Sequence, residues 1–187
     1  MSQPIRALPT NYNGIDFRSR LEARWAVWLD AMKVKWTYEP EGFTDGTLSY
    51  LPDFYLHKGD SYIEIKPIDP TDDEIAKGWL VVKATKRNLY FCVGMPPDAD
   101  DNQREIMGLH WARDDGPQMP QDWVTSTSSR WALCIHCGTC RPATMGMTER
   151  LHCCKENDAH SGGNDLEDWK INHAADKARG FNFLGDR

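Results

Sequence analysis

The chain has 187 residues, of which 40% are hydrophobic and 27% are charged, so it can build one core domain with room for a small appendage. It contains no run of about 18 apolar residues, so no membrane span is predicted. No apolar stretch of signal-peptide length lies near its start, so no secretion signal is predicted. We therefore expect a cytoplasmic protein whose six cysteines are thiols or metal ligands rather than disulfides. The net charge of -6 argues against tight, non-specific binding to a nucleic-acid duplex.

The first part of the sequence predicts an arm, a helix and a strand. Residues 1–13 lack periodicity and end at an Asn13-Gly14 turn, so we interpret them as an N-terminal arm. From Phe17 to Met32, apolar residues recur at helical spacing, which predicts an amphipathic helix. Residues 36–43 contain a proline and a glycine and predict a short or edge strand.

Two β-rich runs follow, at residues 48–56 and 62–68. They flank residues 57–60, whose sequence HKGD favours a turn. The pattern predicts that the two runs are adjacent antiparallel strands of a hairpin.

The next elements predict a helix and a buried strand. Residues 72–85 form the predicted helix, with Thr71 or Asp72 as its N-cap. Residues 88–94 (NLYFCVG) are typical of a strand that is buried on both faces, and Cys92 within it is predicted to be an inert thiol. The order of helix, three strands, helix and strand predicts an α/β (α+β) core in which helices flank a sheet.

The composition changes after Ser126, and we divide the chain accordingly. The predicted parts are the arm at 1–13, the core at 14–125, and a small Cys/His-rich segment with a C-terminal helix at 126–187. Further strand is predicted within 106–112 and 123–124. Six tryptophans lie in mixed apolar segments and are predicted to be core residues: Trp25, Trp28, Trp36, Trp79, Trp111 and Trp123.

The predicted hairpin carries residues that suit phosphodiester hydrolysis. Glu64 and Lys66 are two positions apart on one strand, so they project from the same face, which Asp53 can approach from the neighbouring strand. Mg²⁺ prefers carboxylate oxygens, and the backbone carbonyl of Ile65 is a further candidate ligand. Such a metal neutralises phosphate charge and lowers the pKa of bound water, while the lysine can orient or deprotonate that water.

The stretches YLPDFYL and YIEIKP, with FRSRLEARW before them, resemble the signature of the PD-(D/E)XK nuclease superfamily, in particular its phage-borne and restriction-like members. TDDEIAK and NLYFCVGMP resemble the family's next helix and strand, so the resemblance covers roughly residues 14–97. It implies a restriction-endonuclease-like αβββαβ core, Mg²⁺ or Mn²⁺, and cleavage of a DNA or RNA backbone in a bacterial or phage-infected cell. In many members a glutamate on the leading helix completes the metal site, and Glu22 matches that position. The helix after the E-x-K strand lacks the glutamine of the exonuclease branch.

Ordinary structural roles compete with these assignments. Glu64 and Lys66 can form a solvated pair on an exposed strand, with Asp53 as a turn residue. Glu22 can pair with neighbouring arginines on a solvated helix face. The same helix carries three arginines that either contact phosphates or lie on that solvated face: Arg18, Arg20 and Arg24.

The C-terminal segment contains a C-x-x-C-G knuckle in which Gly138 permits a tight turn. Structural zinc takes four Cys or His ligands, usually as two close pairs. We predict one structural Zn²⁺ with Cys134, Cys137, Cys153 and Cys154 as ligands, and with His152 or Cys140 as substitutes. The alternatives are unligated thiols or a redox pair.

Three functions follow from these residues. The first is a Mg²⁺-dependent endonuclease that acts on nucleic acid, with DNA as the expected substrate. The second is a non-cleaving protein of the same fold that binds nucleic acid or a protein partner through its zinc segment, which the acidic net charge favours. The third is a His/Asn/His metal-finger nuclease, for which no catalytic histidine can be placed in the sequence.

Overall fold

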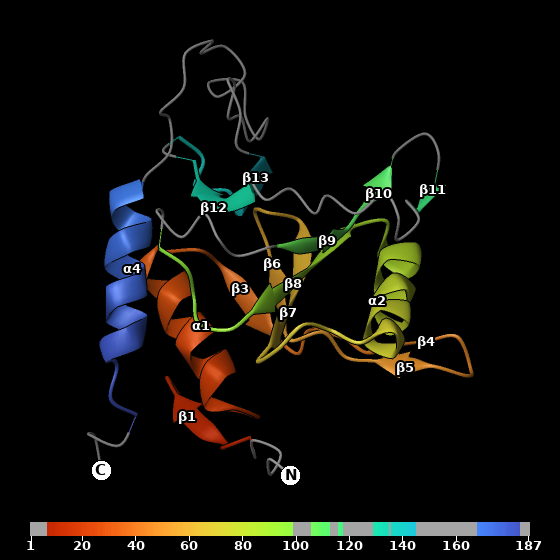
Figure 1. Ribbon diagram of the computed structural model, residues 1–187, viewed down its shortest axis with the longest axis horizontal. Helices are drawn as coiled ribbons and strands as arrows, with labels where there is room; N and C mark the ends of the chain where they lie inside the picture. The colour runs from red at the N-terminus through yellow and green to blue at the C-terminus, as the bar shows by residue number, and fades with distance from the viewer. Residues whose placement is uncertain are drawn as a thin grey trace.

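The computed structural model describes residues 7–98, 106–112, 116–117, 129–134, 136–144 and 168–183. Within these ranges the chain forms three helices, one five-stranded mixed sheet and four two-stranded sheets (Figure 1). The protein is therefore mixed α+β, which confirms the fold class at this level. In chain order the elements are β1 Thr10–Tyr12, β2 Ile15–Phe17, α1 Arg20–Ala31, β3 Trp36–Tyr38, β4 Phe43–Thr44, β5 Ser49–Tyr50, β6 Phe54–Leu56, β7 Ser61–Lys66, α2 Asp72–Thr85, β8 Asn88–Val93, β9 Met107–Leu109, β10 Trp111–Ala112, β11 Gly116–Pro117, β12 Ser129–Leu133, β13 Cys140–Thr144 and α4 Asp168–Gly180.

The central sheet has the strand order β3-β6-β7-β8-β9. β3 pairs antiparallel with β6, and β6 pairs antiparallel with β7. The chain then crosses over through α2, and β8 lies parallel to β7. The predicted hairpin is confirmed, because Phe54 opposes Ile63 and Leu56 opposes Ser61. If only α1, α2 and the strands of the central sheet are counted, the chain order matches the predicted helix, three strands, helix and strand, but the separate pair β4 and β5 lies between β3 and β6.

The prediction of one strand over residues 48–56 is wrong. Ser49–Tyr50 forms β5 and pairs with β4, whereas β6 begins only at Phe54. Pro52 lies between the two strands, and its ring nitrogen carries no N–H for a strand ladder. Asp53 consequently lies in a bend directly before β6.

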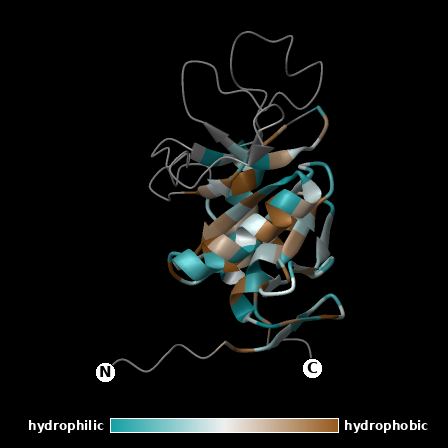
Figure 2. Cartoon of the chain, turned by 90° about the vertical axis from the view of Figure 1, so that its right-hand side faces the viewer, coloured by the Kyte–Doolittle hydropathy of each residue, from teal (hydrophilic) through white to brown (hydrophobic). Residues whose placement is uncertain are grey.

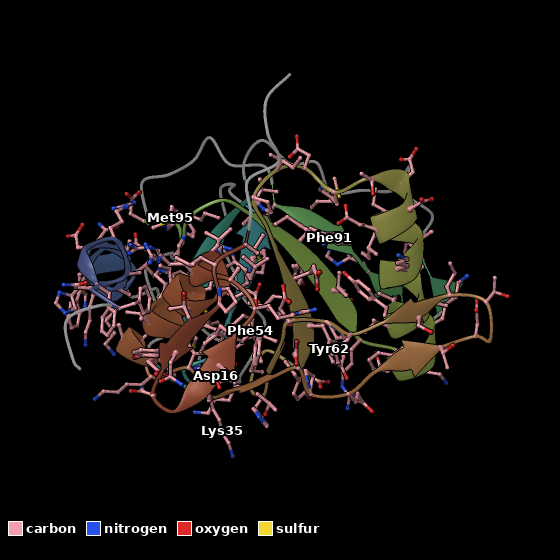
Figure 3. All side chains as sticks on the ribbon, turned by 90° about the horizontal axis from the view of Figure 1, so that it is seen from below. Asp16, Lys35, Phe54, Tyr62, Phe91 and Met95 are labelled. Atoms are coloured by element: carbon pink, nitrogen blue, oxygen red, sulfur yellow. The ribbon has the colours of Figure 1, made fainter. Side chains whose placement is uncertain are left out.

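The two faces of the sheet pack against different helices, because side chains alternate along each strand (Figure 3). Phe54 and Ile63 lie in the cluster with α1, whereas Tyr62 and Phe91 lie in the cluster with α2. Glu64 is two positions after Tyr62, so it falls on the α2 face. Figure 2 views the molecule from the α2 side and shows hydrophobic and hydrophilic residues alternating along the chain.

The N-terminal residues depart from the predicted arm and helix. Thr10–Tyr12 is a strand, paired with Ile15–Phe17, and the helix begins at Arg20 rather than at Phe17. Asn13 and Gly14 both have positive φ, at 49° and 78°, which suits the tight turn of a two-residue hairpin. Such a turn returns the chain along β1 as β2, which ends two residues before Ser19, the N-cap of α1.

The helix α2 is confirmed at its predicted bounds, Asp72–Thr85. The Thr71 hydroxyl accepts a hydrogen bond from the Glu74 N–H, and the Glu74 side chain accepts one from the Thr71 N–H, which is a complete capping box. The predicted buried strand is also confirmed, as β8, which pairs with β7 on one side and β9 on the other.

Residues beyond position 126 contribute to the same hydrophobic cluster as α1. α4 lies beside α1, and β12 brings Trp131 against Trp25 and Trp28, with ring centroids 5.9 and 5.6 Å apart. Trp25, Trp28 and Trp79 are buried as predicted, and Trp36 is half-buried. The side chains of Trp111 and Trp123, and the strand predicted at 123–124, lie outside the described residues. Of the helices that the structure describes, none has the length and apolar character to cross a membrane.

Candidate active site

Asp53 and Glu64 lie opposite each other at the end of the β6–β7 hairpin. The register that pairs Phe54 with Ile63 places Asp53 beside Glu64 one position further on. The Asp53 N–H donates to Oε2 of Glu64 at 3.2 Å, and the Ile65 N–H donates to Oδ2 of Asp53 at 2.7 Å. The hairpin backbone therefore fixes the two carboxylates in mutual proximity, as the sequence predicts.

Both carboxylates are buried, Asp53 with 3% of its surface exposed and Glu64 with 6%. Burial raises the pKa of Asp53 well above its ordinary value, and the negative charges of Glu64 and Glu22 raise it further. Burial likewise raises the pKa of Glu64, although Lys66 opposes the shift. Two buried like charges repel each other, so a cation between them would be stabilising.

Lys66 lies between two carboxylates. Its Nζ is 3.0 Å from Oε1 of Glu64 and 2.7 Å from Oε1 of Glu74. Burial lowers the pKa of Lys66, but Glu64 and Glu74 more than offset this, so its pKa is raised overall. The ammonium is therefore protonated at neutral pH. It suits charge stabilisation and water orientation better than proton abstraction.

Glu22 is 7% exposed and belongs to the first turn of α1. The Ser19 hydroxyl accepts from the Glu22 N–H at 3.1 Å and donates to Oε1 of Glu22 at 2.6 Å. The Tyr38 hydroxyl donates to Oε2 of Glu22 at 2.6 Å. These bonds fix the Glu22 side chain beside Ser19, the N-cap of α1, while its charge acts on Asp53.

Arg18 is the cation nearest to the buried carboxylates from the α1 side. Its Nη2 lies 2.6 Å from Oδ1 of Asp53, and its Nε lies 2.8 Å from Oε1 of Glu39. The side chain is 53% exposed, so it can leave Asp53 without unpacking the core. The sequence left Arg18 as either a phosphate contact or a solvated residue, and the structure gives it Asp53 as a partner.

Tyr50 is a site neighbour that the sequence did not indicate. Burial raises the pKa of its phenol well above the ordinary value, and the negative charges of Glu64 and Asp53 raise the pKa further. Its hydroxyl oxygen is buried close to Glu64, although no described residue meets it at full hydrogen-bond geometry. β5 carries Tyr50 to this position through its pairing with β4, a contact that no local sequence signal reveals.

The donor set suits a divalent cation in its chemistry, although its oxygens are engaged in hydrogen bonds and ion pairs. Asp53, Glu64 and Glu22 supply carboxylates, and the Ile65 backbone lies between Glu64 and Lys66. In the part of the chain that the structure describes, no three Cys, His, Asp or Glu side chains form a group that could hold a metal ion. Arg18 is engaged with one oxygen of Asp53, so a cation that binds there would compete with its guanidinium.

The predicted zinc knuckle is described in part. The Gly138 N–H donates to the Cys134 carbonyl at 2.9 Å, the Cys134 N–H donates to the Thr139 carbonyl at 3.0 Å, and Gly138 has φ of 70°. Cys140 is fully buried at the start of β13, directly after this turn. His152, Cys153 and Cys154 lie outside the described residues.

The knuckle contacts the hairpin that carries the carboxylates. Lys58 Nζ donates to the Cys137 carbonyl at 2.6 Å, and the Thr139 hydroxyl donates to the Lys58 carbonyl at 3.4 Å. A Cβ at Gly59 would lie 2.8 Å from the Cys140 carbonyl, so only glycine allows this approach. The hairpin turn is thus held by the knuckle at one end and by the Asp53–Glu64 contact at the other.

Comparison of the chain with known proteins yields no match to a family model, to a curated protein or to a solved structure.

Proposed function

We propose that the protein is a divalent-metal-dependent endonuclease of the PD-(D/E)XK type that hydrolyses phosphodiester bonds in DNA, with a restriction-endonuclease-like fold. One observation carries the proposal: two buried carboxylates, Asp53 and Glu64, meet at a hairpin end with Lys66 bonded to one of them. An inert ion pair does not need two carboxylates buried against each other at a cost in stability.

Asp53 and Glu64 would hold Mg²⁺ or Mn²⁺, with Glu22 and the Ile65 carbonyl as further oxygen donors. When bound, the ion supplies charge neutralisation at the phosphate and acidifies a coordinated water. Lys66, protonated between Glu64 and Glu74, orients the attacking water and offsets negative charge that develops on the phosphate. Arg18 neutralises Asp53 in the ion-free protein, and its exposed side chain is available for a phosphate once the ion replaces it.

We further propose that the Cys/His-rich segment binds one structural Zn²⁺. Cys134 and Cys137 would provide one ligand pair and Cys153 with Cys154 the other, with His152 or Cys140 as substitutes. Zinc would stabilise the knuckle and, through the bond from Lys58 to the Cys137 carbonyl, the hairpin turn that positions Asp53.

A second function is supported by the Arg18–Asp53 ion pair. A guanidinium placed 2.6 Å from Oδ1 of Asp53 can replace a metal permanently, and the net charge of -6 disfavours tight binding to a duplex. Both features suit a nuclease-like protein that binds nucleic acid or a protein partner without cutting it.

The experiment that separates the two functions is a cleavage assay on purified protein. Plasmid, linear, branched and single-stranded DNA, and an RNA of the same sequence, are each incubated with Mg²⁺, Mn²⁺ or EDTA. The nuclease proposal expects cleavage of at least one substrate with either metal and none with EDTA. Intact substrates under every condition would favour the non-cleaving function instead.

A further inference from the structure

A pocket of about 510 Å³ is formed by three segments that are distant in sequence. The β1–β2 hairpin, the first turn of α1 and the residues after α4 meet there, near the lower end of α1 in Figure 1. The volume falls within the range of about 300–1,000 Å³ that is usual for small-ligand sites. The lining includes Tyr12, Asn13, Arg20, Phe181 and Phe183, and no lining residue is acidic.

Arg20 is the cation of this pocket. Its Nε is buried and has no hydrogen-bond partner, and no ion pair of its guanidinium occurs in the described part of the chain. Arg24, one turn further along α1, has a lowered pKa because of burial and then because of the Arg20 charge. The fold therefore keeps an unneutralised arginine beside a second one, although like charges at this spacing are destabilising. A bound anion would pair with the Arg20 guanidinium and would also reduce its repulsion of Arg24.

Three aromatic rings also line the pocket. Tyr12 and Phe181 meet edge to face at 5.2 Å between centroids, and Phe181 and Phe183 lie 4.8 Å apart. Arg24 lies over the Phe183 ring at 5.5 Å. The Tyr12 hydroxyl and the Asn13 amide both donate to Oδ2 of Asp30, which fixes their orientation. A ligand that combines a flat ring with an anion matches these aromatic rings and Arg20 together.

We infer that the pocket binds one nucleotide of a single-stranded nucleic acid, with its base against Phe181 and Phe183 and its phosphate at Arg20. An unpaired base can stack on aromatic side chains, which a base within a duplex cannot do. Local stacking with one phosphate contact also suits a chain with a net charge of -6, whereas a duplex-binding face would need several cations. The inference deepens the proposed nuclease function, because Arg20 follows Arg18, the partner of Asp53, by two residues.

The pocket and the proposed active site are both linked to the first turn of α1. Arg20 and Glu22 lie on opposite sides of the first turn of α1, since Arg20 lines the pocket while Glu22 is bonded to Tyr38. The two side chains therefore lie on either side of a helix that is roughly 10 Å in diameter, and the charge of Glu22 acts on Asp53. A strand that leaves the pocket can reach Asp53 within a few nucleotides. The pocket would select substrates with an unpaired segment beside the cleaved bond.

The test is fluorescence anisotropy with a labelled single-stranded oligothymidylate of about 12 nucleotides, within the roughly 4–16 nucleotide footprint of single-strand-binding folds. It is performed in EDTA, where the proposed cleavage cannot occur. Arg20→Gln and Phe183→Leu should each weaken binding by about tenfold or more, because one removes the phosphate contact and the other the stacking plane. Arg20→Gln should also lower the salt dependence by about 0.7 in log–log slope.

The charge-matched control is Lys83→Ala, which removes an exposed cation from α2, on the other side of the sheet. It should leave both the affinity and the salt slope unchanged. Thermal melting should show Arg20→Gln to be as stable as the original protein or more so, because the Arg24 repulsion is relieved. Wild-type affinity in both pocket variants, an equal loss in the Lys83 control, or no binding by the original protein would each overturn the inference.

The binding result is independent of catalysis. If the original protein binds the oligonucleotide through Arg20 and cuts no substrate, the pocket stands and the nuclease proposal falls. If it cuts DNA and the pocket variants bind as before, the nuclease proposal stands and the pocket inference falls.

Discussion

Asp53→Asn should make the ion-free protein more stable while it abolishes metal-dependent cleavage. Asparagine keeps the shape of the side chain and an oxygen that can accept the Ile65 N–H bond. The substitution removes the negative charge of Asp53, which is buried beside Glu64. Burying a polar or charged group in this way costs on the order of 1–3 kcal/mol. The substitution also removes the contact to Arg18, which is 53% exposed, so that this loss is at most about 1 kcal/mol.

The net gain in the free energy of unfolding is about 1–2 kcal/mol at neutral pH. For a chain of this size, that corresponds to a rise in Tm of about 2–8 °C. The measurement is thermal unfolding in EDTA, followed by circular dichroism. The matched control is Asp176→Asn on α4, a carboxylate whose side chain is 80% exposed and which should change Tm little.

The pH dependence of stability tests independently whether the charge of Asp53 destabilises the folded protein. Burial, and then the charges of Glu64 and Glu22, raise the pKa of Asp53 in the folded protein above the value of about 3.9 expected in the unfolded chain. Between these two pKa values the folded state binds more protons, so stability falls as pH rises through that window. Asp53→Asn removes this contribution, so its stability should fall less over the same window.

Added Mg²⁺ should make the original protein more stable than Asp53→Asn. At a concentration of about 100 times its Kd, the ion would stabilise the original protein by about 2.7 kcal/mol, whereas Asp53→Asn should gain far less. A fall in Tm for Asp53→Asn in EDTA, or an equal Mg²⁺-induced rise in both proteins, would refute the view that Asp53 is a strained metal ligand.

Three further predictions concern Lys66, Glu22 and the predicted zinc ion. Lys66→Met should lose most cleavage yet keep the Mg²⁺-induced rise in Tm, because it removes a cation and not a metal ligand. Loss of that rise would instead make Lys66 part of the metal-binding site. Glu22→Gln should weaken Mg²⁺ binding severalfold with little change in Tm, since the amide oxygen can accept from one of the two hydroxyls and the NH₂ can donate to the other. Unchanged Mg²⁺ affinity by titration calorimetry would contradict this. Elemental analysis should find about one zinc per chain, and removal of zinc should lower Tm; protein without zinc and with Cys134 and Cys137 freely titratable would oppose it.

Local signals predicted the parts of the fold that depend on neighbouring residues. The Thr71 cap and the apolar run at Asn88–Val93 are continuous in sequence, so α2 and β8 were found at or near their observed bounds. The Asp53–Glu64 pair was predictable for a similar reason, because a short turn fixes the register of the hairpin on both sides of it.

The missed features depend on contacts between distant segments. Tyr50 reaches Glu64 only because Pro52 divides the predicted strand and β5 pairs with β4 instead. The ion pair of Arg18 with Asp53 joins residues 35 positions apart, and no spacing rule reports it. The contact between Ser19 and Glu22 did have a signal, since the two residues are three positions apart, which is the spacing of an N-cap and the N–H that it accepts from.

The central claim is that Asp53 belongs to the active site of a nuclease, and cleavage by Asp53→Ala tests it most directly. The original protein and the variant, purified in parallel and shown by circular dichroism to be equally folded, are incubated with plasmid, linear, branched and single-stranded DNA in Mg²⁺. We expect the original protein to cut at least one of these substrates and the variant to cut none at a measurable rate. Undiminished cleavage by Asp53→Ala would place the active site elsewhere in the chain and contradict the account.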